Sequence, residues 1–434
     1  MGTVGLVSLG CAKNRVDAEH LLGGMAARGF QVVGDPAGAE VVIVNTCGFI
    51  REAIEESIDE ILEASRWKTE GRCRVLVVAG CLAKRYPDIA KDLPEVDLFF
   101  TPEDIGRIPE VLAGAGSPAA RPAKAPTRIL TQPAHTAYLK IAEGCSNRCT
   151  YCTIPSIRGE FRSLPEGSLL AEASELADRG TVEINLVAQD VTSYGLDRGD
   201  PIALARLLGK LEALRGLRWI RLLYAYPRPF PPGVVEVLAA GGKTLPYLDL
   251  PIQHIHPRIL RAMGRSIPPE EVERQIGELR ERIPGLVLRT TAIVGFPGET
   301  DEEFQALVDF VRRTRFHHLG AFAYSREEGT PAAKMRPRVP ARVARARLEG
   351  LLAVQAEVSA SRNQELIGQE LDVLVDGSDE GGVLVGRTYG QAPEVDGQTK
   401  LSGCPEDRAA PGSFVRARIR EAWEYDLGAE VIGS

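Results

Sequence analysis

The sequence predicts an α/β protein: a parallel sheet domain at the N-terminus, a partial barrel of six βα units at the centre and a small all-β barrel at the C-terminus. Val, Ile and Leu runs alternate with amphipathic helical stretches over most of the chain, as in parallel sheets covered on both faces. One Ala- and Pro-rich stretch interrupts this rhythm, and the last part of the chain changes to short strands separated by Gly and Pro turns. We therefore expect domains at 1–113, 136–365 and 366–434, with a linker at 114–135.

The N-terminal domain is expected to contain four buried strands. Its apolar runs are VGLVSLG, EVVIVNTC, RVLVVAGC and VDLFF. Helical patterns follow the first two runs, over residues 17–28 and 51–65. In an open parallel sheet the carboxyl ends of the strands share one edge, and ligands bind in the crevice there. Residues that directly follow these runs are therefore candidates for a functional site.

The central domain is expected to repeat the βα unit. Its strand candidates are YLKIA, VEINLVAQD, LRWIRLLYA, YLDLP, VLRTTAIVGFP and HLGAFAYS. Six units are too few for the eight-fold barrel, so an open, partial barrel is predicted. A basic and then helical arm at 333–365 leads to the C-terminal module, where ELDVLVDG, GVLVGRT and SFVRARIREAW predict a small β-barrel.

Composition indicates an ordinary globular protein. The chain has 434 residues, of which 44% are hydrophobic and 26% charged, enough for two or three cores. No apolar run approaches the roughly 20 residues that cross a bilayer, and the N-terminus lacks the marks of a signal peptide. The net charge of −7 argues against a nucleic-acid coating function. We expect a cytoplasmic protein whose clustered thiols are metal ligands or redox groups, because eight cysteines are too few for a disulfide scaffold.

One set of cysteines follows three different strands. Cys11, Cys47 and Cys81 each end an apolar run, in SLGC, VNTC and VAGC. A buried cysteine is often only a small hydrophobic residue, and this would explain one such position. Three equivalent positions on three parallel strands instead favour a shared metal site at the carboxyl edge of the sheet.

A second set lies within one loop. Cys145, Cys149 and Cys152 have the spacing C-x3-C-x2-C directly after the strand YLKIAEG, at the end of a βα unit that carries active sites in barrels. Thiolates select zinc or an iron–sulfur cluster. Zinc would normally take a fourth Cys or His at a matching spacing, and none follows nearby. A four-iron cluster with one iron left free for a substrate or cofactor is favoured, with zinc as the alternative.

The loop CSNRCTYC resembles that of the radical S-adenosylmethionine enzymes, with the aromatic Tyr151 before the last cysteine. The resemblance implies that this loop holds a 4Fe-4S cluster whose free iron binds S-adenosylmethionine (SAM), which is cleaved to a 5′-deoxyadenosyl radical. The order of the domains is similar to that of the methylthiotransferases, with a radical-SAM barrel at the centre and a TRAM-like tail. That family implies a second 4Fe-4S cluster on Cys11, Cys47 and Cys81, which carries the sulfur to be delivered.

Two branches of this family compete. SLGCAKNRVDAE, NTCGFI, CTIPSIRG, LVAQDVTSYG and YLDLPIQH are each similar to the RimO branch, which implies methylthiolation of an aspartate β-carbon in the small-subunit ribosomal protein S-twelve. The alternative is the MiaB branch, which modifies an adenosine of tRNA. The departures are small, since Ala12 stands where proline is common and Leu250 where methionine is common.

The charge of the C-terminal module supports the first branch. Residues 366–434 contain 13 Asp and Glu against 6 Lys and Arg, a balance of −7. A module that binds tRNA phosphates is expected to be basic, whereas an acidic module attracts a basic protein. A solvated acidic surface without a partner remains an alternative, and the arginine-rich arm at 336–347 could contact RNA or cap a helix.

Weaker candidates lie at other strand ends. We predict SAM contacts from Tyr151, Gln189, Asp190 and Gly295, and a catalytic role for Gln253 and His254, although strand caps, tight turns and structural hydrogen bonds would explain the same residues. Because iron–sulfur clusters reach low potentials, we expect a low-potential electron donor such as flavodoxin. We expect the free ribosomal protein or a 30S particle as substrate, and the three-domain plan of the chain is consistent with a monomer. An iron–sulfur electron carrier and a zinc-binding interaction protein are the non-enzymatic alternatives.

Overall fold

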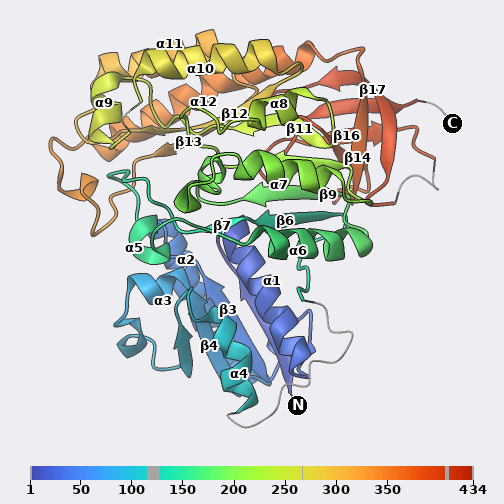
Figure 1. Ribbon diagram of the computed structural model, residues 1–434. Coiled ribbons are helices and arrows are strands. Elements are labelled where there is room, and N and C mark those ends of the chain that lie inside the picture. The colour runs from blue at the N-terminus through green and yellow to red at the C-terminus, as the bar shows by residue number, and fades with distance from the viewer. Residues whose placement is uncertain (1, 115–126, 266, 406–409, 433–434) are drawn as a thin grey trace.

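A computed structural model describes residues 2–114, 127–265, 267–405 and 410–432. It has the three predicted parts (Figure 1): an N-terminal α/β unit in blue, a central unit from green to orange and a C-terminal barrel in red. The predicted fold class is confirmed. In the described part of the chain, no helix is both long and apolar enough to cross a membrane.

The N-terminal sheet has five parallel strands in the order β2-β1-β3-β4-β5. The strands are β1 (Thr3–Ser8), β2 (Gln31–Val32), β3 (Val41–Thr46), β4 (Val75–Gly80) and β5 (Leu98–Phe100). The helices are α1 (Ala12–Ala27), α2 (Arg51–Glu70), α3 (Cys81–Arg85) and α4 (Ile108–Ala113). Ile61 of α2 packs on one face of the sheet and Met25 of α1 on the other, so both faces are covered as the apolar runs predicted.

The first helix begins earlier than its periodicity predicted. It starts at Ala12 rather than Asp17, because Cys11 has an extended backbone and forms the N-cap. The turn of α1 nearest the sheet edge therefore carries polar residues, which hid it from a search for apolar periodicity. As a result, the first turns of α1 lie beside the carboxyl edge of the sheet.

The central sheet has six parallel strands in chain order, β6-β9-β10-β11-β12-β13, and its two outer strands do not pair. It is therefore an open, partial barrel. Its strands are β6 (Thr136–Lys140), β9 (Glu183–Val187), β10 (Trp219–Leu222), β11 (Thr244–Asp249), β12 (Val287–Val294) and β13 (His318–Ala323), with a short hairpin of β7 (Ala142–Glu143) and β8 (Arg162–Ser163). Its helices are α5 (Ile154–Arg158), α6 (Glu166–Asp178), α7 (Ala203–Glu212), α8 (Val234–Ala239), α9 (Pro257–Ala262), α10 (Pro269–Arg282) and α11 (Asp301–Thr314).

A long helix, α12 (Ala341–Gln364), joins the central unit to a closed five-stranded barrel of order β14-β15-β16-β18-β17. The strands are β14 (Glu370–Ser378), β15 (Leu384–Thr388), β16 (Thr399–Ser402), β17 (Phe414–Ala422) and β18 (Leu427–Val431). The sequence predicted three of these strands. It missed the short β16 and the terminal β18, which pair in parallel through residues far apart in the chain.

The three units share one apolar cluster inside the partial barrel. Val16 of α1, Tyr138 and Tyr247 of the central strands, and Ala392 of the C-terminal barrel pack together there. Beside them, Glu394 has a left-handed backbone, with φ of 67°. Its carboxylate pairs with Arg15 of α1 and accepts a hydrogen bond from Tyr138 Oη at 3.1 Å. The β15–β16 connection therefore fastens all three units to one another.

The predicted linker at 114–135 is described only at residue 114 and from 127 onward; residues 115–126 lie outside the described residues. Arg128 is buried and pairs with Glu19 of α1 at 2.5 Å and with Glu172 of α6 at 2.8 Å. His135 is buried as well and lies 2.9 Å from Asp376 of the C-terminal barrel. The described part of this stretch is therefore packed between the units by ion pairs.

Candidate functional site

Cys11, Cys47 and Cys81 lie together at the carboxyl edge of the N-terminal sheet. Cys11 is the N-cap of α1, Cys47 follows β3, and Cys81 begins α3 directly after β4. A Cβ atom added to Gly10 would lie 3.0 Å from Cβ of Cys47 and 3.3 Å from its Sγ. A Cβ atom added to Gly48 would lie 2.8 Å from the carbonyl oxygen of Cys81. Glycine at these two positions therefore allows the cysteine-bearing loops to approach one another.

The three thiols influence one another electrostatically. Burial, together with the nearby Cys81 and Cys11, raises the pKa of Cys47 to about 11. Cys11 reaches solvent, yet the surrounding protein removes part of its hydration, which alone would raise its pKa. The Lys13 ammonium and the backbone N–H of Asn14 outweigh that effect and lower the pKa of Cys11. Thiols that hinder one another's ionisation suit a bound cation, because the metal replaces the protons.

Cys145, Cys149 and Cys152 lie on one loop between β7 and α5. The loop is fixed by its own backbone, since Cys145 N–H donates to Gly159 O at 3.0 Å and Cys152 N–H donates to Cys149 O at 3.2 Å. Gly144 is required before the first cysteine, because its φ is 72° and a Cβ there would lie 2.1 Å from a backbone oxygen. One continuous loop therefore brings this set of cysteines together.

The second loop also has a shared thiol environment. Burial raises the pKa of Cys152 to about 12, with a further contribution from Cys149 and Cys145. The N–H of Ile154 donates to the Cys152 sulfur at 3.5 Å, and Thr150 N–H ties the loop to Met263 O at 2.9 Å. This set is therefore also a suitable donor set for a cationic cluster.

A buried arginine stands beside the second set. Arg265 is only 5% exposed; one guanidinium nitrogen, Nη1, lies 3.9 Å from Cys149 Sγ and 3.3 Å from Tyr151 Oη. Nη2 donates to Pro251 O at 2.6 Å, and the guanidinium lies 4.3 Å from the centre of the Tyr226 ring. In the described part of the chain, no carboxylate pairs with it. Since a buried, unpaired charge is costly, an anionic group beside Cys149 would offset this cost, and a thiolate-bound cluster or a SAM carboxylate fits.

Asp190 supports the same loop. Its carboxylate accepts hydrogen bonds from Asn147 Nδ2 at 3.0 Å and from Ser193 Oγ at 2.9 Å, and it pairs with Arg228. Asn147 belongs to the cysteine loop itself, so Asp190 anchors that loop from the end of β9. Gln189 beside it is half-buried, and its side chain has no hydrogen-bond partner within the described ranges. The predicted SAM contacts of both residues remain predictions.

The segment that follows β11 has a strained backbone at one residue. Gln253 has φ of 68°, which is uncommon for a residue other than glycine. Its N–H donates to Thr291 O at 2.8 Å, its carbonyl accepts from Ile293 N–H at 2.7 Å, and its Oε1 is buried without a partner in the described structure. Strain of this kind often occurs at functional sites, and an unpaired amide oxygen is suited to a ligand. The predicted catalytic role of Gln253 stays a prediction that this geometry favours.

His254 and Gly295 have structural explanations. His254 is fully buried, burial lowers its pKa to about 3, and its Nδ1 accepts a hydrogen bond from His256 N–H at 3.0 Å. The imidazole is therefore neutral and holds the turn that follows Gln253. A Cβ on Gly295 would lie 2.5 Å from Cβ of Ala344, so glycine lets α12 pack closely. Neither observation tests the predicted roles, which stay predictions.

A largely buried charge network connects the two cysteine sets. Lys140 pairs with Asp17 and, at 2.6 Å, with Glu143. Arg158 pairs with Asp17 at 2.7 Å and with Glu143 at 3.2 Å. Arg158 also donates to Asn14 Oδ1, which lies 3.6 Å from Cys81 Sγ. Since Arg158 ends the short helix after the second cysteine loop, it links that loop to the first set.

Neither this network nor Arg265 stood out in the sequence. A signal for the network existed, because Asp17 lies within SLGCAKNRVDAE and Arg158 within CTIPSIRG, two motifs that carried the resemblance. Arg265 had no comparable signal, since nothing in its neighbourhood in the chain marks it as buried. Within the described ranges, no three His, Cys, Asp or Glu side chains are gathered tightly enough to hold a single metal ion.

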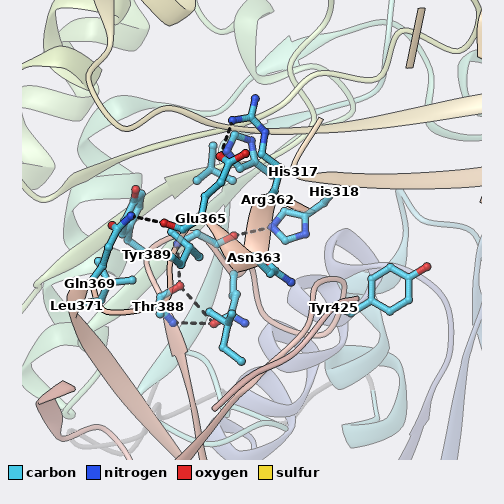
Figure 2. A pocket seen from close by; sticks show the side chains of 15 residues that line it. His317, His318, Arg362, Asn363, Glu365, Gln369, Leu371, Thr388, Tyr389 and Tyr425 are labelled. Carbon is cyan, nitrogen blue, oxygen red and sulfur yellow. Dashed lines mark hydrogen bonds and ion pairs between the residues drawn. The ribbon is translucent and has the colours of Figure 1, made fainter. Parts of the chain in front are cut away.

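A cavity of about 130 Å³ lies elsewhere, at the seam between α12, the start of β13 and the C-terminal barrel (Figure 2). Several of its polar side chains bind one another or nearby backbone: His318 Nε2 donates to Gly390 O at 2.7 Å, and Arg362 pairs with Glu365 at 3.2 Å. None of the described residues that line it is a cysteine. We interpret it as a packing seam between domains.

Many carboxylates of the C-terminal barrel are used in ion pairs. Of the eleven that the structure describes, six pair with Arg or His: Glu370, Asp372, Asp376, Glu394, Asp396 and Glu430. Glu394 and Asp396 reach residues of the other units, since they pair with Arg15 and Arg289. The acidic balance of this module therefore serves domain docking as well, which weakens the inference from charge to a basic partner.

Comparison with known families agrees with the three parts of the fold. The radical SAM superfamily matches residues 139–311, the uncharacterized protein family UPF0004 matches residues 3–101, and the TRAM domain matches residues 367–432. Among solved structures, the radical S-adenosylmethionine methyltransferase TsrM from Kitasatospora setae aligns with a TM-score of 0.54 at 17% identity, over 76% of this chain and 77% of that chain. At this identity the likeness concerns the fold alone.

Curated relatives match the chain from end to end. The ribosomal protein uS12 methylthiotransferase RimO of Geobacter sulfurreducens is 48% identical over 99% of this chain and 98% of its own length. RimO of Heliobacterium modesticaldum is 47% identical over 98% of this chain and 94% of its own length. The similarity spans both cysteine sets and all three units. The chain therefore belongs to the RimO family of ribosomal protein uS12 methylthiotransferases.

Proposed function

We propose that this protein attaches a methylthio group to the β-carbon of an aspartate in ribosomal protein uS12. The observation that carries the proposal is structural: two sets of three thiols lie at the carboxyl edges of two sheets, joined by the Arg158 network. Each set has the donor chemistry of an iron–sulfur site. The full-length similarity to RimO proteins supports uS12 as the substrate.

The target carbon explains why such a site is needed. An aspartate β-carbon has no acidic proton at neutral pH, so general acid–base catalysis does not suit it. When bound, a 4Fe-4S cluster with SAM supplies a carbon-centred radical, and a second 4Fe-4S cluster supplies the sulfur.

Residues of the central unit form the site at which the radical would be generated. Cys145, Cys149 and Cys152 would hold its cluster, and their loop leaves the fourth position for SAM. Arg265 holds a positive charge beside Cys149 and Tyr151, which stabilises an anionic group there. Asp190 keeps the loop in place through Asn147, and the unpaired Oε1 of Gln253 is available to a ligand.

Residues of the N-terminal unit form the site that would hold the sulfur-donating cluster. Cys11, Cys47 and Cys81 would hold its cluster. Asn14 ties α1 to the end of β3 and to Arg158, because its Nδ2 donates to Thr46 O at 2.9 Å while its Oδ1 accepts from Arg158. The network thus sets the relative position of the two sites, which transfer between them requires.

The remaining partners follow from this chemistry. Because iron–sulfur clusters of this class operate at low potential, we propose a low-potential, flavodoxin-like electron donor. Because the proposed substrate is part of the ribosome, we also propose a cytoplasmic location. We further propose that the protein works as a monomer, since both cysteine sets and the network between them lie within one chain.

Mass spectrometry on cells that lack the gene, with and without its restoration, tests the function. We expect uS12 to gain the mass of one CH3S in place of one H on a single aspartate when the gene is restored, while digested tRNA stays unchanged. A gain on a tRNA adenosine alone would contradict the proposal and establish the MiaB alternative. No gain on either molecule would favour an iron–sulfur carrier.

A further inference from the structure

An exposed basic surface lies beside the second cysteine loop. It occupies the segment that joins β13 to α12 and the first turns of α12, drawn in orange in Figure 1. We call it the basic strip, and its exposed side chains are Arg326, Lys334, Arg336, Arg338, Arg342 and Arg345.

The strip is not neutralised by the protein. Among the residues that the structure describes, no carboxylate pairs with any of its six side chains. By contrast, Arg347 on the buried side of α12 pairs with Glu299 at 2.7 Å and with Asp301 at 2.6 Å. Of the two acidic residues between 326 and 345, Glu327 is buried and pairs with Arg85 of the N-terminal unit at 2.7 Å. A single exposed carboxylate, Glu328, remains against six positive charges.

The positive charges of the strip also lie where they do not stabilise the fold, close to one another and near the N-terminus of α12. Partial desolvation and the neighbouring positive charges of Arg326 and Arg336 lower the pKa of Arg338. Helix N-termini favour Asp and Glu, and α11 follows this rule with Asp301, Glu302 and Glu303. The first turn of α12 has no acidic residue, and Arg342 and Arg345 follow instead. Folding alone does not explain this arrangement, whereas an anionic partner would.

The strip is fixed close to the reaction site. Ala332 N–H donates to Thr150 O of the second cysteine loop at 2.9 Å. Met335 and Tyr151 contact the same small apolar cluster. On its other side, Glu327 accepts a hydrogen bond from Arg51 N–H at 3.1 Å. The basic surface therefore borders both cysteine-bearing units, where a bound substrate must approach.

We infer that the basic strip binds the phosphate backbone of ribosomal RNA, so that the enzyme recognises uS12 within the assembled small subunit rather than as a free protein. This inference rests on the proposed function for the identity of the substrate. The whole chain carries a net charge of −7, so an RNA-rich particle repels it in general. A local surface of unpaired arginines next to the site overcomes that repulsion and orients the enzyme, because phosphate contacts position a protein without reading sequence.

The test compares two triple variants of the full-length protein. R336E/R338E/R342E reverses the charge of three of the six residues of the strip. R72E/R215E/R312E makes the same charge change at three exposed arginines that form no ion pair within the described residues. Binding to purified 30S particles and to naked small-subunit rRNA is measured across salt concentrations, and methylthiolation is measured on free uS12 and on 30S particles that lack the modification.

We expect the strip variant to lose about tenfold or more in affinity for both RNA-containing probes, with a salt slope shallower by roughly 2–3, because three phosphate contacts are removed. The wild-type enzyme should modify 30S particles faster than free uS12. The strip variant should lose this advantage while keeping wild-type activity on free uS12, and the control should match the wild type throughout. Equal loss in both variants, or a loss on free uS12 as large as on 30S particles, would overturn the inference. If the wild-type enzyme modifies neither substrate, the proposed function fails, while the binding measurements still decide the role of the strip.

Discussion

The two cysteine sets hold the same number of thiols and are built in opposite ways. Cys145, Cys149 and Cys152 come from one continuous loop of eight residues' span, whose backbone bonds within itself, to Gly159 and, through Thr150, to Met263 and Ala332. Cys11, Cys47 and Cys81 come from the ends of three strands, and their proximity depends on the order of the sheet. One site is local and the other is tertiary. The tertiary site is therefore expected to be more sensitive to changes in the packing between domains.

The charge network sharpens this contrast. Arg158 belongs to the helix that follows the local site, yet its contacts with Asp17 and Asn14 lie in the helix that frames the tertiary site. The local site thus supports the tertiary one. Four predictions test the comparison, in order of decreasing effect.

The largest effect is expected for Cys149→Ala. Removing one thiol from the loop should abolish both SAM cleavage and methylthiolation and lower the bound iron by about half, since one of two 4Fe-4S clusters is lost. Iron analysis and detection of 5′-deoxyadenosine measure this. Cys404→Ala in the C-terminal barrel is the control and should retain full iron and cleavage. Unchanged iron in the Cys149 variant would show that the loop is no cluster site.

Cys47→Ala should separate the two sites. We expect it to lose methylthiolation and about half of the iron, while SAM cleavage continues, because the local site does not depend on the N-terminal thiols. The same two assays apply. Cys73→Ala, at a buried cysteine in the core of the same domain, should keep both activities. Loss of SAM cleavage in the Cys47 variant would mean that the sites are not independent.

Arg158→Met tests the link between them. The substitution leaves the largely buried Asp17 and Glu143 carboxylates with Lys140 alone and should lower the free energy of unfolding by about 3–5 kcal/mol. In denaturant titrations, iron from the tertiary site should be released before iron from the local site. Arg72→Met, at an exposed arginine without an ion pair in the described structure, is the control. Simultaneous release from both sites would refute the idea that packing matters more for the tertiary site.

The smallest effect is expected far from both sites, at Asp376. Burial opposes its charge, but His135 and Arg387 outweigh this and lower the pKa of the carboxyl group. Because the folded pKa lies below that of an unfolded aspartate, about 3.9, the carboxylate stabilises the folded state above about pH 4. This contribution is lost as the pH falls toward the folded pKa.

Asp376→Asn should therefore cost about 1.5–3 kcal/mol at neutral pH and flatten the loss of stability below pH 4, measured by denaturant unfolding at several pH values. The iron content at neutral pH should not change. Glu380→Gln, at an exposed carboxylate of the same barrel, is the control and should behave like the wild type. An unchanged pH profile in the Asp376 variant would show that this ion pair does not stabilise the docking of the barrel.

The sequence by itself determined the features that depend on neighbours in the chain. The spacing of Cys145, Cys149 and Cys152 is a property of one loop, and the apolar runs define strands because a buried parallel strand must be apolar on both faces. The positions of Cys11, Cys47 and Cys81 followed from one further rule, that parallel strands end at a common edge. These signals also carried the resemblance to the RimO branch.

Only the tertiary structure decided how charged side chains are used. Arg158, Lys140, Asp17 and Glu143 are ordinary surface types in the sequence, and nothing local indicates that they are buried together between two units. The acidic tail shows the same limit, since counting charges could not reveal that Glu394 and Asp396 pair with the other domains. The physical reason is that a charge acts on whatever lies within a few ångströms. Those neighbours come from distant parts of the chain, which only folding brings together.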